Sequence, residues 1–378
     1  MTYITIRQCF IVGTIATLGL LGCKDDDTVV SPEPTILNTI PAFYLPSEEA
    51  SYGMNEPIIE LIAGSTERVD EPWDLDFHPF RENELWILNK GFENTGGSTV
   101  TLSNAGMSNQ SYEWRRDGNA WHFMAHPTAL SFSLDNGNWA TTPEILDANR
   151  RGGAFTGPSL WSSDMSIYAR PSGGNGSHLD MLHESPYSMG VEWDKGNAFW
   201  VYDGHNEDIC WYDFAEDHGP GASNHDDGRV HRYTDMVTKR KPGVASHLVL
   251  DRESGWLYLA DAGNARILKM NTKTGSKKRN ITQAMERLAE NIEITGVDWK
   301  VFASSNLQEP SGIDIDGDIL YVSDHKTGEI IAYSLKLGYE IARFDTGKKG
   351  IMGIKVDKNG HLWFVSTDTD EVYRIIPQ

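Results

Sequence analysis

The sequence predicts an all-β protein, a six-bladed β-propeller closed by an N-terminal strand, with long loop insertions in the early blades. Two observations carry this prediction. One pattern of apolar residues occurs six times between residues 56 and 378. The last copy is one strand short, and a segment ahead of the first copy supplies a suitable strand. Repetition of short strands at this period is typical of propellers.

Each copy begins with two apolar residues two positions apart, a spacing that places both side chains on one face of a strand. The pairs are Leu75/Phe77, Leu130/Phe132, Val191/Trp193, Leu248/Leu250, Ile313/Ile315 and Ile354/Val356. A turn and a second apolar strand follow, as at 199–202 and 362–365. Third and fourth strands are visible at 329–333 and 340–344. Four antiparallel strands per copy predict one blade per copy.

The two ends of the chain predict how the ring closes. The sixth copy stops after its third strand at 371–375, and residues 58–62 read as a strand just before the first copy. Pairing the two segments would remove two exposed sheet edges, which an open array would leave bare.

Two long segments, 91–125 and 139–184, interrupt the period, and we expect them to form loops that shape a binding surface. Trp121, Trp139 and Trp161 lie in them, where aromatic rings can stack on a sugar. A third interruption, 280–290, predicts a short helix with Asn280 as its N-cap.

The N-terminal part predicts a signal peptide and a lipid anchor. Arg7 precedes an apolar run at 9–21 that is too short to span a bilayer. The run ends in Leu20-Leu21-Gly22-Cys23, which resembles a bacterial lipobox with Cys23 as the acylated residue. We therefore expect a signal peptide at 1–22, a lipidated Cys23 with a flexible tether at 23–55, and the propeller at 56–378.

The expected location is the bacterial cell envelope, with the lipid on Cys23 holding the protein at the outer membrane. The acidic run at 24–27 resembles a surface-export signal of Bacteroidetes lipoproteins, but it is equally a solvated spacer. Both the periplasm and the outer surface therefore stay open.

Two stretches resemble NHL repeats. They are Pro310-Ser311-Gly312-Ile313-Asp314-Ile315 with Leu320-Tyr321-Val322-Ser323-Asp324, and His247-Leu248-Val249-Leu250-Asp251 with 257–267. The resemblance implies a six-bladed ring around a central channel. It implies no single function, because such propellers serve many.

Composition limits the partners. The chain has 33 Lys and Arg against 54 Asp and Glu, a net charge of −21, which disfavours nucleic-acid binding. Of its three cysteines, Cys9 and Cys23 lie in the signal and anchor region, so Cys210 has no disulfide partner. We expect Cys210 to be a small buried side chain.

Histidines indicate where a metal could bind. Seven of the 12 fall between His178 and His247. We single out His183, His205 and His247 as ligands of one divalent metal, zinc or calcium, at the channel mouth, with His126 and His325 in related places. The alternative is that loop hydrogen bonds satisfy these rings.

The amidating lyases that act on peptidyl-hydroxyglycine look similar in fold and hold zinc through histidines two positions before the apolar pairs. Those positions here are Trp73, Thr128, Met189, Ser246, Ser311 and Met352. None is a histidine, so the resemblance does not extend to that chemistry.

Acidic residues give further candidates. Asp203, Asp261 and Asp324 each end a second strand, where a carboxylate either caps the following turn or contacts a ligand or cation. The acidic stretch 213–228 is either a calcium loop or a solvated one.

Two functions remain from the sequence. The first is a lipid-anchored binding or scaffold protein that holds an unidentified protein, peptide or carbohydrate on the loop-rich face and channel mouth. The second is a metal-dependent lyase or hydrolase with a histidine-lined site in the channel, so enzymatic activity stays open.

Overall fold

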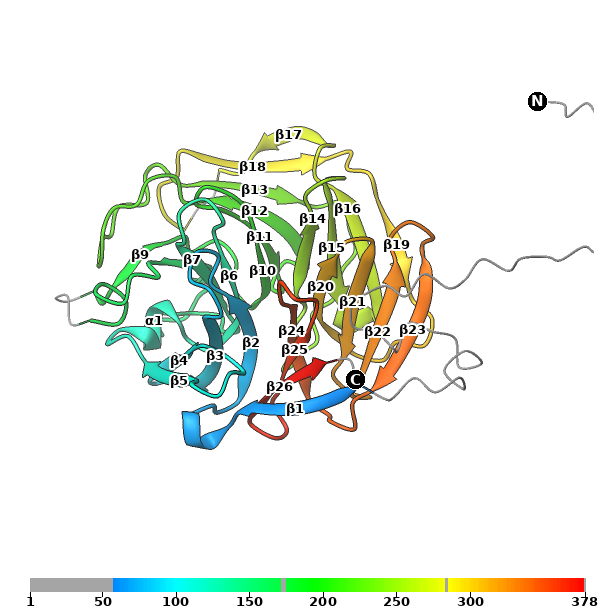
Figure 1. Cartoon of the computed structure of the whole chain (residues 1–378). Helices are drawn as coiled ribbons and strands as arrows, with labels where there is room; N and C mark the ends of the chain where they lie inside the picture. The colour runs from blue at the N-terminus through cyan, green and yellow to red at the C-terminus, as the bar shows by residue number, and fades with distance from the viewer. Residues whose placement is uncertain (1–56, 171–174, 283–284, 377–378) are drawn as a thin grey trace, which may run out of the picture. The chain divides into compact units, whose positions relative to one another are not determined.

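The computed structural model describes residues 57–170, 175–282 and 285–376, and they form the predicted six-bladed β-propeller. The predicted signal peptide (1–22) and the predicted tether with Cys23 (23–55) lie outside the described residues. Six innermost strands surround the centre, and further strands extend outward from each (Figure 1). No helix among the described residues has the length and apolarity needed to cross a membrane.

The first three blades follow the chain. Blade one contains β2 (Pro72–Phe77), β3 (Leu85–Phe92), β4 (Gly96–Ser103) and β5 (Ser111–Arg115). Blade two contains β6 (Pro127–Phe132), β7 (Trp139–Pro143), β8 (Ser159–Trp161) and β9 (His178–Met181). Blade three contains β10 (Ser188–Lys195), β11 (Ala198–Asp203), β12 (Asp208–Asp213) and β13 (Arg229–Tyr233), followed outward by β18 (Glu290–Thr295) and β17 (Ser276–Asn280).

The last three blades complete the ring. Blade four contains β14 (Leu248–Asp251), β15 (Trp256–Asp261), β16 (Arg266–Asn271) and β19 (Trp299–Ala303). Blade five contains β20 (Pro310–Asp316), β21 (Ile319–Asp324), β22 (Glu329–Ser334) and β23 (Tyr339–Asp345). Blade six contains β24 (Ile351–Val356), β25 (Leu362–Ser366), β26 (Glu371–Ile376) and β1 (Ile58–Ala63). The helical turns are η3 (Ser65–Glu67), α1 (Ala120–Phe123) and η4 (Ala262–Asn264).

The N-terminal strand closes the ring, as predicted. β1 pairs antiparallel with β26, with Ile59 opposite Ile375. Figure 1 shows the first and last strands, blue and red, side by side. The fourth strand of blade six is thus supplied by a segment from the opposite end of the described chain.

The two expected insertions are in part regular strands. The first contains β4 and β5, and the second contains β7, β8 and β9, so the described loop residues lie mainly at 144–158, 162–170 and 175–177. Trp139 and Trp161 are fully buried in blade two and cannot stack on a sugar, whereas Trp121 is 36% exposed. The early blades therefore depart from the repeat pattern less than the sequence indicates.

The helix expected over 280–290 is wrong. The described residues of this segment carry the end of β17, a connection and the start of β18. β18 pairs in parallel with β13 and so extends blade three, although β16 and β19, which flank the β17–β18 hairpin in the chain, belong to blade four. This β17–β18 hairpin lies across the outside of blade three (Figure 1).

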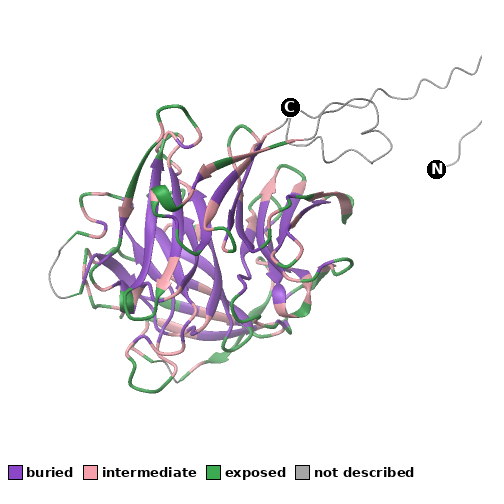
Figure 2. Ribbon diagram, turned by 90° about the horizontal axis from the view of Figure 1, so that it is seen from below, coloured by how far each residue is buried: buried purple, intermediate pink, exposed green. Residues whose placement is uncertain are grey.

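Polar side chains join the innermost strands of successive blades. An innermost strand is a sheet edge, and the N–H groups along it need acceptors. The contacts are Leu130 N–H to Asp74 at 2.8 Å, Phe132 N–H to Asp76 at 3.2 Å, Trp193 N–H to Ser131 at 3.0 Å and Val356 N–H to Asp314 at 2.7 Å. Apolar side chains fill the space between blades, where Figure 2 shows mostly buried residues.

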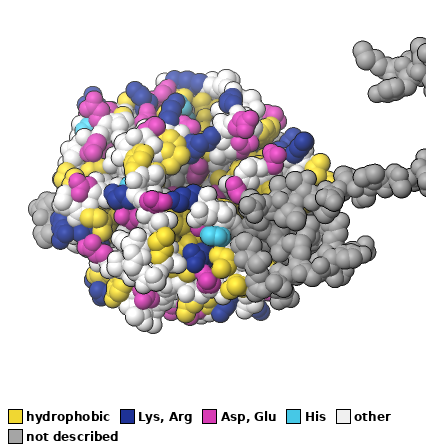
Figure 3. Space-filling view, viewed as in Figure 1, with side chains coloured by type: hydrophobic (Ala, Val, Ile, Leu, Met, Phe, Trp, Pro, Cys, Tyr) yellow, Lys and Arg dark blue, Asp and Glu magenta, His cyan; other side chains and the backbone are white. Residues whose placement is uncertain are grey.

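The blade topology defines two faces. Turns between first and second strands, such as 78–84 and 357–361, form what we call the hairpin face. Turns between second and third strands, such as 204–207 and 325–328, together with the connections between blades, form the crossover face. Acidic and basic side chains are interspersed over the surface seen in Figure 3.

Candidate functional site

The three recurring aspartates hold turns on the crossover face. Asp203, Asp261 and Asp324 are all fully buried. Asp324 accepts hydrogen bonds from four backbone N–H groups, those of Gln308, Glu309, Lys326 and Thr327, at 2.7–3.2 Å. Asp261 accepts from Lys239 N–H at 2.9 Å and from the Arg266 guanidinium at 2.7 Å. Their oxygens are occupied by protein donors, as turn-capping carboxylates are.

His247 lies in the central channel. It directly precedes β14, and its Nε2 is 2.9 Å from the Thr128 carbonyl oxygen of blade two. Its Nδ1 lies 3.6 Å from Asp74 of blade one. Contacts with the innermost strands of two other blades place the ring across the channel axis.

The channel is packed shut next to His247. The six positions located two before the apolar pairs are each at most 2% exposed; they are Trp73, Thr128, Met189, Ser246, Ser311 and Met352. Trp73, Met189 and Met352 belong to the main apolar core. The crossover end of the channel is therefore filled by buried side chains, three of them apolar.

Further along the channel, one lysine faces several carboxylates. Lys355 Nζ lies 3.7 Å from Asp76 and 3.8 Å from Asp314. Burial disfavours its charge, but the surrounding carboxylates outweigh this and raise the pKa of Lys355. Burial also raises the pKa of Glu192 to about 7, although Lys355 and Arg252 oppose that rise.

His126 and His325 lie apart from one another. His325 Nδ1 is 3.1 Å from Glu309 Oε2, and Lys241 pairs with the same glutamate. His126 has a left-handed backbone, and burial together with Lys90 lowers its pKa. Among the described residues, neither belongs to a group of three side chains able to hold one ion.

His183 and His205 line one small cavity on the crossover face, about 290 Å³ in volume, together with Arg232 and Arg279. His183 is buried, whereas His205 is exposed. His247 is absent from its lining, so the structure brings together two of the three predicted ligands and leaves the third in the channel.

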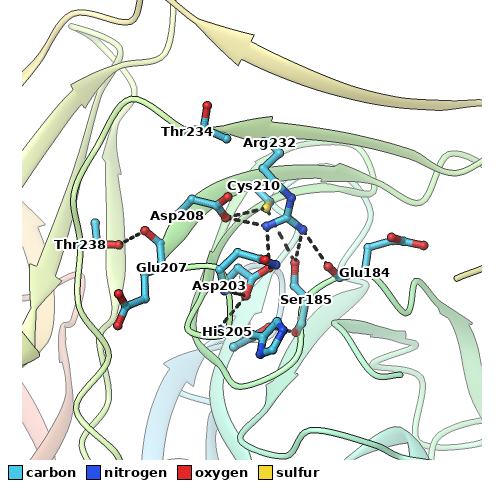
Figure 4. A network of polar contacts seen from close by, with 12 residues as sticks. Glu184, Ser185, Asp203, His205, Glu207, Asp208, Cys210, Arg232, Thr234 and Thr238 are labelled. Atoms are coloured by element: carbon cyan, nitrogen blue, oxygen red, sulfur yellow. Dashed lines mark hydrogen bonds and ion pairs between the residues drawn. The ribbon is translucent and has the colours of Figure 1, made fainter. Parts of the chain in front are cut away.

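An arginine network forms one wall of this cavity (Figure 4). The Arg232 guanidinium lies 2.6 Å from both Asp203 and Asp208, and it donates to the Glu184 carbonyl at 2.7 Å. Burial raises the pKa of Asp208 to about 7, with Arg232 opposing. Cys210 is fully buried beside Asp208, and burial raises its pKa, so its thiol is not activated. Arg232 already holds the position between the carboxylates that a cation would take.

A second histidine group lies beside the cavity. His183, His225 and Glu286 each offer one ligand atom, all within 4.8 Å of one another. Asp180, His218 and Asp227 form a neighbouring group of the same size. The sequence marked the histidine-rich stretch and the 213–228 loop, but it did not indicate Glu286, which arrives on the β17–β18 hairpin.

The larger cavity lies on the hairpin face between blades one and six, with a volume of about 550 Å³. Its lining includes His78, Phe80, Met107, Lys358, Trp363 and Arg374. Phe80 is 59% and Met107 49% exposed. Burial and the nearby Arg81 lower the pKa of His78 to about 4, so this ring is neutral at pH 7.

Comparison with known proteins defines the class of fold. No family model matches the chain, and no curated protein matches it by sequence. An auxiliary nutrient binding protein from Bacteroides ovatus is 10% identical over 85% of this chain and 77% of its own, with a TM-score of 0.56. A streptogramin B lyase (13% identical, 78% and 76% covered) and a nidogen/laminin complex (15%, 74% and 81%) each have a TM-score of 0.46. The first of these similarities supports the propeller fold alone.

Proposed function

We propose that this protein is a lipid-anchored binding protein of the bacterial cell envelope that holds a ligand without turnover. The 550 Å³ cavity between blades one and six carries the proposal. Its volume is in the range of small-molecule sites, and it combines apolar surface with a few polar groups. Exposed apolar side chains such as Phe80 and Met107 rarely cluster on a protein surface unless they contact a ligand or partner.

The charges of this cavity suit a ligand of low net charge, a saccharide or a short peptide. Each of its cations already has an acidic partner. Arg81 lies 2.8 Å from Glu84, and Arg374 lies 2.9 Å from Glu60. Lys358 pairs with Glu82. A bound sugar ring or apolar side chain would stack on Phe80, and the paired ions would offer hydrogen bonds.

The cell-envelope location rests on Cys23 and its lipobox-like context. β1, the first described strand, starts at Ile58 opposite Ile376, which is at the hairpin face. The chain thus enters the propeller on the face that bears the cavity. The fold shared with a nutrient binding protein of Bacteroides ovatus supports a binding role by analogy.

The test is a thermal-unfolding screen of the purified protein with oligosaccharides and short peptides, followed by calorimetry. Phe80→Ala should weaken binding of a hit at least tenfold (about 1.4 kcal/mol). Phe92→Ala is the matched control, because Phe92 is 70% exposed on the crossover face. Conversion of the ligand into product, or wild-type affinity in Phe80→Ala, would overturn the proposal.

The alternative, a metal-dependent lyase or hydrolase in the channel, gains little from the geometry. Among the described residues, no group of three metal-ligating side chains includes His247. Buried side chains of Trp73, Met189 and Met352 also occupy the crossover end of the channel.

A further inference from the structure

We propose a zinc site at the outer edge between blades two and three, with His183, His225 and Glu286 as its protein ligands. One nitrogen from each ring and one carboxylate oxygen lie within 4.8 Å of one another. This site is separate from the cavity between blades one and six, and the proposal does not depend on what that cavity binds.

Three separate segments build the site. His183 lies in the connection from β9 to β10, His225 in the loop from β12 to β13, and Glu286 in the β17–β18 hairpin. Two reciprocal contacts fix the hairpin in place. His183 N–H donates to Glu286 Oε1 at 2.6 Å, and Met285 N–H donates to Glu184 Oε1 at 2.6 Å. The hairpin's departure from blade four therefore delivers one carboxylate to the two rings.

The distances suit a tetrahedral ion. Glu286 Oε2 lies 2.9 Å from His183 Nδ1 and 3.7 Å from His225 Nε2. Zinc–ligand bonds of 2.0–2.1 Å in a tetrahedron separate neighbouring ligand atoms by about 3.3 Å. These two distances lie on either side of that value, and the two ring nitrogens lie within 4.8 Å of each other.

A carboxylate behind one ring orients it for metal binding. Asp180 Oδ1 lies 2.6 Å from His225 Nδ1, so this nitrogen carries the proton that it donates. Nε2 then directs its lone pair towards Glu286 Oε2, an arrangement that needs either a second proton or a metal ion between the two atoms. Carboxylate–histidine–metal chains of this form are usual in zinc sites.

Among the described residues, two buried polar atoms next to the site have no hydrogen-bond partner. They are His183 Nε2 and Asp180 Oδ2. His183 is 5% and Asp180 1% exposed. Unpaired buried polar atoms are rare in folded proteins, and an ion or ordered water commonly explains them. Because His183 faces Glu286 through Nδ1, neither atom is a ligand atom of the site, and we expect ordered water to satisfy both.

The donor set selects the metal. Two imidazoles and one carboxylate favour zinc over calcium or magnesium, which prefer all-oxygen sites. Three protein ligands leave a fourth position for water or an added group. His183 also lines the 290 Å³ cavity, in which Arg232 and Arg279 are each already paired with carboxylates.

Cobalt binding tests the site. The purified full chain is stripped with a chelator and titrated with Co²⁺ while its visible spectrum is recorded, and Zn²⁺ content is then measured by elemental analysis. We expect one equivalent of either metal and the intense bands of four-coordinate Co²⁺. Glu286→Gln and His225→Ala should each weaken binding at least 100-fold. Asp180→Asn should weaken it about 10-fold to 100-fold, as loss of an outer partner does.

His231→Ala is the matched control, because His231 pairs with Glu290 outside the group. It should bind Co²⁺ like the wild type. Thermal unfolding of every variant shows that each is folded. Absence of one-equivalent binding, or full binding in both Glu286→Gln and His225→Ala, would overturn the zinc site. Ligand binding at Phe80 should be unchanged in Glu286→Gln, so the two proposals fail separately.

Discussion

Arg374 of β26 and Glu60 of β1 form an ion pair across the seam that closes the ring, although 314 residues separate them in the sequence. Arg374 Nε lies 2.9 Å from Glu60 Oε2, and its guanidinium also contacts the Gly106 carbonyl of blade one at 3.2 Å. The same side chain lines the 550 Å³ cavity. The seam and the proposed binding cavity therefore share a wall.

The seam should contribute strongly to stability. Ile59 packs against the apolar core of blades five and six, whereas Leu61 on the same strand is 59% exposed. Ile59→Asp places a charge in that core and should lower the free energy of unfolding by about 3 kcal/mol.

Leu61→Asp is the control, and its effect should stay within about 0.5 kcal/mol. Urea unfolding followed by tryptophan fluorescence measures both variants. Equal losses in the two would show that β1 does not seal the ring through Ile59.

The fold was predictable because its signal is local. Apolar pairs such as Leu75/Phe77 and Ile313/Ile315 mark each innermost strand, and the missing fourth strand in the last copy predicted the β1–β26 pairing. Spacing within a few residues determines which side chains face inward, so one sequence is enough to find the blades.

The β17–β18 hairpin was not predictable in the same way. All residues of β17 are exposed, so it carries no apolar alternation. β18 is held by parallel pairing with β13, about 60 residues earlier in the chain. The error at 280–290 also hid Glu286, whose contact with His183 spans 103 residues. A polar strand such as β17, and a contact between residues far apart in the chain, leave no periodic mark in the sequence.

The buried turn aspartates should be structural. Asp324→Ala removes the acceptor of four backbone N–H groups in a site without exposure, and it should cost about 3 kcal/mol or more. Asp318→Ala, at an exposed turn of the same blade, should cost less than about 0.5 kcal/mol. Chemical unfolding measures the loss of stability in each variant. Adding calcium should not change the free energy of unfolding of the wild type or of either variant. If calcium stabilised the wild type but not Asp324→Ala, Asp324 would instead be a cation ligand.

Glu192 should make stability depend on pH. Burial raises its pKa from 4.5 to about 7, so the folded protein binds more protons than the unfolded chain between those values. Stability therefore falls as pH rises from 4.5 to 7, by at most about 3 kcal/mol from this group.

Glu192→Gln has no proton to lose, so its unfolding free energy should exceed that of the wild type progressively more from pH 4.5 to pH 7. Urea midpoints measured at several pH values give the difference between the two proteins, from which other titrating groups cancel. Parallel curves for the two proteins would contradict the raised pKa of Glu192.

The Arg232 network should be among the most sensitive sites in blade three. Arg232→Met leaves Asp203 and Asp208 buried without their cation, a change that typically costs about 3–5 kcal/mol. Because burial raises the pKa of Asp208 to about 7, protonation relieves part of this cost at pH 5, and the loss should be smaller there than at pH 8.

Arg229→Met is the control: Arg229 is 48% exposed and pairs with Asp213 at 3.0 Å, so its loss should cost below about 1 kcal/mol at both pH values. Urea unfolding of both variants at the two pH values measures the loss of stability in each. If Arg232→Met lost the same stability at pH 5 and at pH 8, Asp208 would already be ionised at pH 5.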